Sequence, residues 1–126
     1  FYKGQVLYSK IRPSLSKAVI APYDGLCSAD MYPLKSLIDP DYLLLSILSE
    51  DFLAQVRKLE NRIKMPKLNV GSLSSIHIAL PPLAEQSRIV AKVKSMFQLC
   101  DQMRAKIEAS QQCSIKLANT LTSQIH

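Results

Sequence analysis

The hydrophobic positions of the first 38 residues form short runs separated by turn residues. Apolar side chains cluster at residues 6–8 and 18–21, and Pro13, Pro22 and the pair Asp24-Gly25 interrupt them. Short apolar runs between such residues are typical of strands joined by turns. Residues 26–34 predict a third, half-buried strand, and Pro33 marks its edge or its end because proline cannot donate to a sheet.

A helical period replaces this pattern after residue 38. Asp39 and Pro40 form a helix start, because Asp39 can accept from free backbone N–H groups and Pro40 has none to leave unsatisfied. Residues 42–48 predict a short buried helix. Ser49-Glu50-Asp51 then caps a second helix that continues to Leu59 or Asn61.

One more strand and one long helix complete the expected elements. Alternation of Ile76, Ile78 and Leu80 predicts the strand, which Pro81-Pro82 stops. From Ala84 to Gln124 there is neither glycine nor proline, which predicts a single helix of about 60 Å.

The long helix carries an apolar stripe in alternating steps of four and three, the spacing of a coiled coil, with Ser110 and Ser114 in its middle. The apolar members of this predicted interface, called the seam below, are Ile89, Val93, Met96, Cys100, Met103, Ile107, Leu117 and Leu121. So small a globular part cannot cover a stripe of this length. The helix is therefore expected to need a partner helix, from another chain or from elsewhere in a longer protein.

Composition narrows the class of protein. The chain has 126 residues, 48% of them hydrophobic, which suits one folded domain rather than a disordered tail. Apolar stretches such as Leu43-Leu44-Leu45 are too short for a membrane span. The three cysteines suggest neither a disulfide framework nor a zinc site, and no secretory signal is evident, so a reducing cytoplasmic location is expected. Because the first residue is Phe1 and not Met, we expect a piece of a longer protein.

Catalytic patterns find little support in the sequence. The three glycines form no phosphate-binding loop, and His77 alternates with two isoleucines, which favours a surface or structural role. A metal nuclease is a third hypothesis, in which Asp41 would pair with Glu60-Asn61-Arg62, where an arginine stands in place of the required lysine. Since Asp39 and Asp41 are better explained as a helix start, the sequence predicts a domain without catalysis, metal or cofactor.

The net charge of +6 is concentrated in two basic segments. Lys10, Arg12 and Lys17 surround Pro13, and a second group comprises Arg57, Lys58, Arg62, Lys64 and Lys67. Closely spaced cations can neutralise DNA phosphates and release counterions. Charge alone does not distinguish such a surface from an ordinary solvated face.

One stretch resembles a known family. Leu68-Asn69 is followed by Ile76-His77-Ile78-Ala79-Leu80-Pro81-Pro82-Leu83-Ala84-Glu85-Gln86 and then Arg88-Ile89-Val90. This order resembles the specificity (S) subunits of type I restriction-modification systems, where a target recognition domain runs into a conserved helix. Segments beginning at Gly4 and Gly25 are also similar to blocks of these domains.

The resemblance implies an α+β fold, with a partial target recognition domain at residues 1–83 and a coiled-coil spacer helix at residues 84–126. S subunits are non-catalytic. Each of their target recognition domains reads one half of a bipartite sequence in double-stranded DNA. Their conserved helices pack antiparallel and dock the methyltransferase (modification) subunits, and through them the restriction subunit.

For this chain the expected partners are therefore DNA and modification subunits, with no membrane. The helix would pair with a second conserved helix or homodimerise. The candidate DNA-contacting residues are Lys10, Arg12, Lys17, Arg62, Lys64, Lys67 and, as a donor to phosphate, Ser28. A coiled-coil interaction domain without DNA contact is the alternative function.

Overall fold

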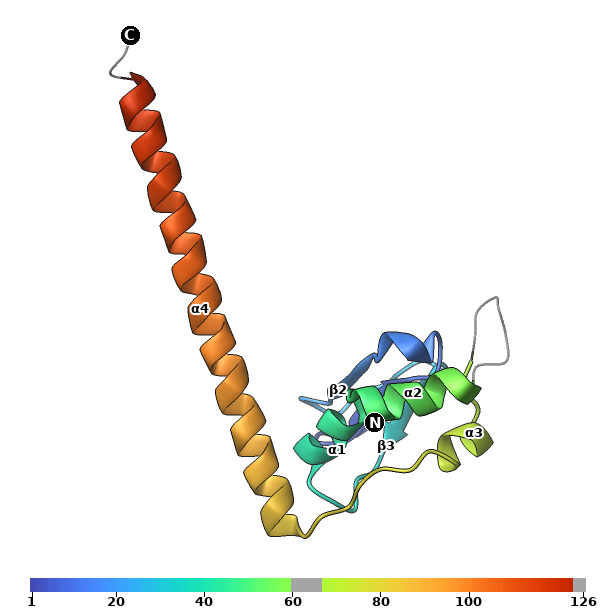
Figure 1. The fold of residues 1–126 in the computed structure, drawn as a ribbon. Helices are drawn as coiled ribbons and strands as arrows, with labels where there is room; N and C mark the ends of the chain where they lie inside the picture. Colours follow the sequence, from blue (N-terminus) through green and yellow to red (C-terminus); the bar gives the residue numbers. More distant parts are fainter. Residues whose placement is uncertain (60–66, 124–126) are drawn as a thin grey trace. The chain divides into compact units, whose positions relative to one another are not determined.

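The computed structural model describes residues 1–59 and 67–123 (Figure 1). Its contacts divide the chain into two units, Phe1–Val90 and Ala91–His126. The first unit combines a small sheet with short helices, and the second continues one long helix. The predicted α+β class is confirmed. The assignment of residues 1–83 and 84–126 to two functional parts stays a prediction.

The sheet has three antiparallel strands in the order β2-β1-β3. Strand β1 (Val6–Ser9) lies in the centre, between β2 (Ala18–Ile20) and β3 (Met31–Leu34). Leu7 faces Val19 on one side and Pro33 on the other. Pro33 thus lies on an edge strand, as its sequence position predicts, because an edge strand tolerates the missing N–H.

The third strand is shorter than predicted, and residues 26–30 are not part of it. Leu26 is 98% exposed. A turn occupies this segment: the Ser28 hydroxyl accepts from the Asp30 N–H at 3.2 Å, and the Ser28 carbonyl accepts from the Met31 N–H at 3.1 Å. Serine side chains compete in this way with a strand ladder for backbone donors.

Two helices follow the sheet as predicted. Helix α1 (Pro40–Ile47) begins at Asp39, whose carboxylate accepts from the N–H groups of Asp41 at 2.9 Å and Tyr42 at 3.1 Å. Helix α2 (Glu50–Leu59) begins after Ser49, whose hydroxyl accepts from the Phe52 N–H at 3.3 Å. The alternative end at Asn61 lies outside the described residues.

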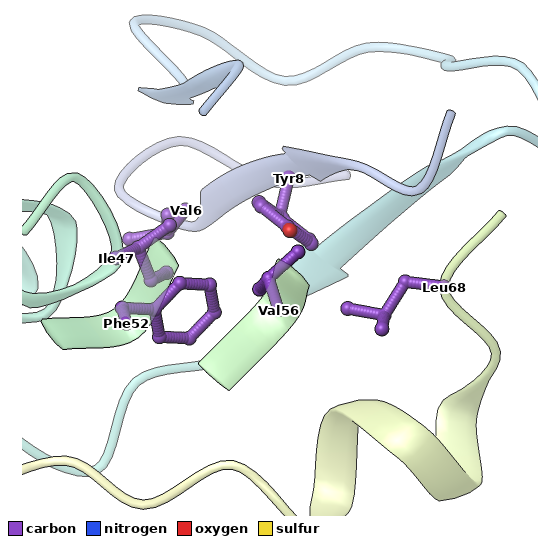
Figure 2. Close-up of a cluster of buried hydrophobic side chains, with 6 residues drawn as sticks. All are labelled: Val6, Tyr8, Ile47, Phe52, Val56 and Leu68. Atoms are coloured by element: carbon purple, nitrogen blue, oxygen red, sulfur yellow. The ribbon is translucent and has the colours of Figure 1, made fainter. Parts of the chain in front are cut away.

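The core lies between one face of the sheet and these helices (Figure 2). Its fully buried cluster consists of Val6, Tyr8, Ile47, Phe52, Val56 and Leu68. The Phe52 ring meets the Tyr8 ring nearly edge-on, with centroids 5.9 Å apart. Alternate residues of β1 supply Val6 and Tyr8, so the period of two in the sequence fixes which face of β1 is covered.

The predicted strand at residues 76–80 is wrong, and a short helix, α3 (Val70–Ser74), precedes this segment unpredicted. The Gln55 side chain takes the place of a neighbouring strand. Its amide donates to the His77 carbonyl at 2.8 Å, and its oxygen accepts from the His77 N–H at 2.9 Å. The segment is therefore held in place without strand pairing, and the exposed His77 takes part through its backbone.

The predicted long helix is confirmed as α4 (Leu83–Ser123), while its expected end at Gln124 lies outside the described residues. Its first turns belong to the globular unit. The buried Gln86 side chain accepts from the Asp39 N–H at 3.1 Å and donates to the Pro81 carbonyl at 2.8 Å, and Val90 is also buried. None of the described helices is long and apolar enough to cross a membrane.

Candidate nucleic-acid interface

A basic loop, residues 10–17, connects β1 to β2. It contains the 3-10 helix η1 (Pro13–Leu15), flanked by Arg12 and Ser16 with φ angles of 48° and 47°. This left-handed conformation costs a residue with a Cβ atom roughly 1–2 kcal/mol. Pro13 is buried and η1 contacts α2, so packing holds the loop in this shape.

Two cations of the basic loop are exposed. Arg12 and Lys17 both project into solvent, and in the part of the chain that the structure describes neither forms an ion pair. Their charge is therefore available to an anionic partner.

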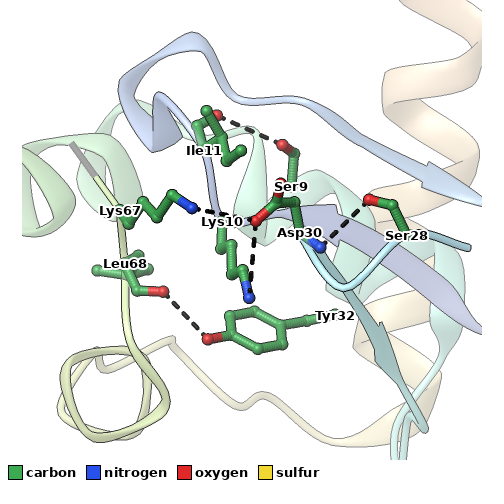
Figure 3. Close-up of polar contacts among 8 residues, drawn as sticks. All are labelled: Ser9, Lys10, Ile11, Ser28, Asp30, Tyr32, Lys67 and Leu68. Carbon is green, nitrogen blue, oxygen red and sulfur yellow. Dashed lines mark hydrogen bonds and ion pairs between the residues drawn. The ribbon is translucent and has the colours of Figure 1, made fainter. Parts of the chain in front are cut away.

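A second group of polar residues surrounds Asp30 (Figure 3). One carboxylate oxygen, Oδ1, lies 3.8 Å from Nζ of Lys10 and 3.4 Å from Nζ of Lys67. Lys10 Nζ also lies 5.5 Å from the centre of the Tyr32 ring, within the range of a cation–π contact. We call Lys10, Ser28, Asp30, Tyr32 and Lys67 the Asp30 cluster.

Backbone hydrogen bonds bring the members of this cluster together from distant parts of the chain. The Lys10 N–H donates to the Asp30 carbonyl, and the Leu68 N–H donates to the Lys10 carbonyl, both at 3.0 Å. The Tyr32 hydroxyl donates to the Leu68 carbonyl at 3.2 Å. Since Leu68 is buried in the core, the neighbouring Lys67 is fixed beside the end of β1.

The predicted DNA-contacting residues therefore fall into three sets. Lys10, Ser28 and Lys67 meet in the Asp30 cluster, whereas Arg12 and Lys17 lie on the basic loop. Arg62 and Lys64 lie outside the described residues. Whether any of these residues touches DNA stays a prediction.

The predicted seam of α4 is largely uncovered beyond Val90. Ile89 and Val93 are half-buried, while Met96, Met103 and Ile107 are each 56% exposed. Leu117 and Leu121 reach 59% and 62%, and Cys100 is exposed. In the described part of the second unit, almost none of the apolar seam is therefore buried.

The residues considered for a metal nuclease have other positions. Asp39 caps α1, and Glu60-Asn61-Arg62 lies outside the described residues. Among residues 1–59 and 67–123, no three His, Cys, Asp or Glu side chains gather closely enough to hold a metal ion.

A comparison with models of protein families identifies the family of this chain. The model described as "Type I restriction modification DNA specificity domain" matches residues 1–110. The chain belongs to this family. The resemblance seen in the sequence is confirmed.

Similar proteins carry the same designation. This specificity domain is 42% identical to the type I restriction enzyme EcoDI specificity subunit of Escherichia coli over 125 residues, 99% of this chain. It is 27% identical to the EcoAI specificity subunit of E. coli in an alignment of 139 positions, gaps included, that covers 97% of this chain. The chain spans 27% and 23% of the lengths of these two relatives, respectively.

The sequence analysis did not predict two members of the Asp30 cluster, Asp30 and Tyr32. The spacing Ser28-Ala29-Asp30 signals a turn, because serine and aspartate bond to nearby backbone. It does not signal that this turn meets Lys10 and Lys67. That proximity depends on pairing between segments far apart in the sequence.

Proposed function

We propose that this specificity domain binds double-stranded DNA through the basic loop and the Asp30 cluster, and that it has no catalytic activity of its own. The match to a DNA specificity domain over residues 1–110 carries the proposal. The exposed Arg12 and Lys17 support it, because exposed cations can replace the counterions of DNA phosphates.

Recognition of a particular sequence requires contacts beyond phosphates. Base edges in the major groove are read by side chains with fixed donors and acceptors, and the phosphate contacts of Arg12 and the lysines would hold the domain in place for that reading. Lys10, Lys17 and Lys67 suit phosphates, as do Arg62 and Lys64 of the connecting segment, and the Ser28 hydroxyl can donate to one. These contacts would set the register of the domain on the duplex.

For α4 we propose the role of a spacer that pairs with a second helix and docks modification subunits, and through them the restriction subunit. The exposed seam supports this, since a stripe of Met, Ile and Leu with steps of four and three fits the holes of another helix. A helix with this repeat would hold a fixed distance between two DNA-binding parts.

The positions flanking the seam favour a different helix over a second copy of α4. Charged residues at these positions are all basic: Lys92, Arg104 and Lys106. The flanking positions are those next to a seam residue within each step of four. Asp101 and Glu108 lie instead within the steps of three that begin at Cys100 and Ile107, so they are not flanking positions. Self-pairing would bring like charges together, so we propose a partner helix with acidic flanks.

Salt dependence of duplex binding tests the DNA proposal. For the full-length protein we expect log affinity to fall linearly with log salt concentration. The double variant Arg12→Gln and Lys17→Gln should reduce that slope by about 2, since each lost phosphate contact contributes about 0.9.

The matched control removes two positive charges from α4, with Lys94→Gln and Lys116→Gln. The control should keep the wild-type slope. Affinity that does not change between low and high salt, or equal slope losses in both double variants, would contradict the assignment of the basic loop.

The pairing proposal is tested by hydrodynamic size. The neutral double change Met96→Gln and Met103→Gln should prevent pairing through the seam and reduce the size of the assembly with modification subunits. The control, Ser95→Gln and Ala105→Gln, makes similar changes outside the seam and should leave the assembly intact. A seam variant of unchanged size would contradict the proposal.

A coiled-coil interaction domain without DNA contact is the second candidate function. The exposed seam favours it, because the seam needs a partner whether or not DNA is bound. This candidate predicts that the protein pairs through α4 while its affinity for duplex DNA has no salt slope.

A further inference from the structure

We propose that Asp30 is a positioning residue that restrains the DNA contacts of Lys10 and Lys67, an inference that rests on the proposed DNA-binding function. Asp30 is an acid that lies close to two lysines. Its Oδ1 lies 3.8 Å from Lys10 Nζ and 3.4 Å from Lys67 Nζ, and its side chain is 42% exposed (Figure 3).

Backbone hydrogen bonds hold Asp30 next to the two lysines. The Asp30 N–H donates to the Ser28 hydroxyl, and the Asp30 carbonyl accepts from the Lys10 N–H. The backbone of Lys67 is held in the same place, because the adjacent Leu68 is buried and its N–H donates to the Lys10 carbonyl. The backbone therefore holds the three residues next to one another, while the long lysine side chains can still turn from Asp30 to a phosphate.

Before DNA binds, Lys10 and Lys67 are paired with Asp30, and in this they differ from Arg12 and Lys17. Arg12 and Lys17 meet a phosphate without giving up an ion pair in the described part of the chain. Lys10 and Lys67 must exchange Asp30 for the phosphate. Lys10 must in addition move relative to the Tyr32 ring that it faces at 5.5 Å.

This exchange has a consequence for counterions. When Lys10 or Lys67 moves to a phosphate, Asp30 is left exposed and attracts a cation from solution. The cation taken up by Asp30 offsets one that the phosphate releases, so binding to arbitrary duplex DNA is weakened. A complex that base contacts hold in register, with phosphates close to both ammonium groups, gains two contacts for this one loss. Asp30 therefore weakens loosely docked, non-specific complexes most.

The test is the affinity of the full-length protein for non-cognate duplex DNA across a salt series. Asp30→Asn keeps the shape of the side chain and removes its charge. Since exposed ion pairs are weak, we expect binding about 3- to 20-fold tighter at low salt. The salt slope should become steeper by about 1.

Three further variants separate this effect from a structural one. Asp30→Glu should restore nearly wild-type binding, because it returns the charge. Adding Asp30→Asn to the double variant Lys10→Gln and Lys67→Gln should change nothing, since the restrained lysines are gone. Asp101→Asn removes one negative charge from α4 and should leave the slope unchanged.

Equal or weaker binding by Asp30→Asn would overturn the inference, as would a gain that persists without Lys10 and Lys67. If the Asp30→Asn variant does not fold, the salt slopes of two single lysine variants test the inference instead. Lys67→Gln should then reduce the slope less than Lys17→Gln, and an equal or larger loss overturns the inference. A wild-type protein without salt-dependent binding would overturn both proposals, whereas the other outcomes overturn only the role of Asp30.

Discussion

The globular unit and α4 use the same apolar residue types in opposite ways. Val56 is 0% exposed and Phe52 4%, because the sheet and the helices of the unit cover them. Met96 and Met103, in an equally regular helical pattern, are each 56% exposed. A periodic apolar stripe thus predicts a helix with one face that packs against other residues. It does not tell whether those residues belong to the same unit of the chain or to a partner.

The sharpest way to test this contrast is to truncate one residue of each kind. Phe52→Ala should lower the free energy of unfolding of the globular unit by about 3–5 kcal/mol, because it leaves a cavity beside Tyr8. Urea unfolding followed by tyrosine fluorescence measures this, since all five tyrosines lie within residues 1–90.

Met103→Ala is the matched change on α4. It should alter the unfolding of the unpaired chain by no more than about 0.5 kcal/mol, as exposed positions do. Similar losses in the two variants would mean that the seam is already covered within the chain, and the comparison would fail.

A smaller effect is expected at the point where the two regions join. Gln86→Ala should cost about 1–3 kcal/mol, because it leaves the Asp39 N–H and the Pro81 carbonyl without their buried partner. The exposed Gln98, on α4 beyond Val90, is the control, and Gln98→Ala should change stability little. If Gln86→Ala behaves like the control, the first turns of α4 are not anchored to the globular unit.

The smallest effect concerns the first turn of α4. Hydrogen bonds from Arg88, together with its charge, lower the pKa of the Glu85 carboxyl below its usual value. A pKa depressed by folding stabilises the folded state above the unfolded pKa, and this contribution is lost as the pH falls through the folded pKa. Because both groups are exposed, the effect on stability should be slight.

An NMR titration of the Glu85 carboxyl measures this shift directly. In Arg88→Gln the pKa of Glu85 should return toward its usual value. A pKa that stays low in the variant would assign the shift to the helix terminus, where the dipole also favours a carboxylate.

Local signals in the sequence predicted much of the fold correctly. Asp39 and Ser49 cap the two helices where they were expected, since a side-chain cap depends only on residues two or three positions away. The uninterrupted stretch after Pro82 predicted α4 for the same reason: no residue within it breaks a helix.

The errors and omissions depend on contacts between distant residues. Ile76, Ile78 and Leu80 alternate as in a strand, but Gln55 supplies the hydrogen bonds that a neighbouring strand would have made. The meeting of Asp30 with Lys10 and Lys67 was equally invisible, because no local spacing reports it. The candidate site could therefore be predicted as a set of cations, but not as an arrangement.

We propose that DNA binding belongs to the basic loop and the Asp30 cluster, while the seam of α4 serves pairing. The most direct test is the salt slope of binding to a duplex too short for two domains, measured for the full-length seam variant Met96→Gln and Met103→Gln. This division of roles predicts the wild-type slope in the seam variant and a loss of about 2 in the double variant Arg12→Gln and Lys17→Gln. A slope that falls in the seam variant and persists in the loop variant would contradict it.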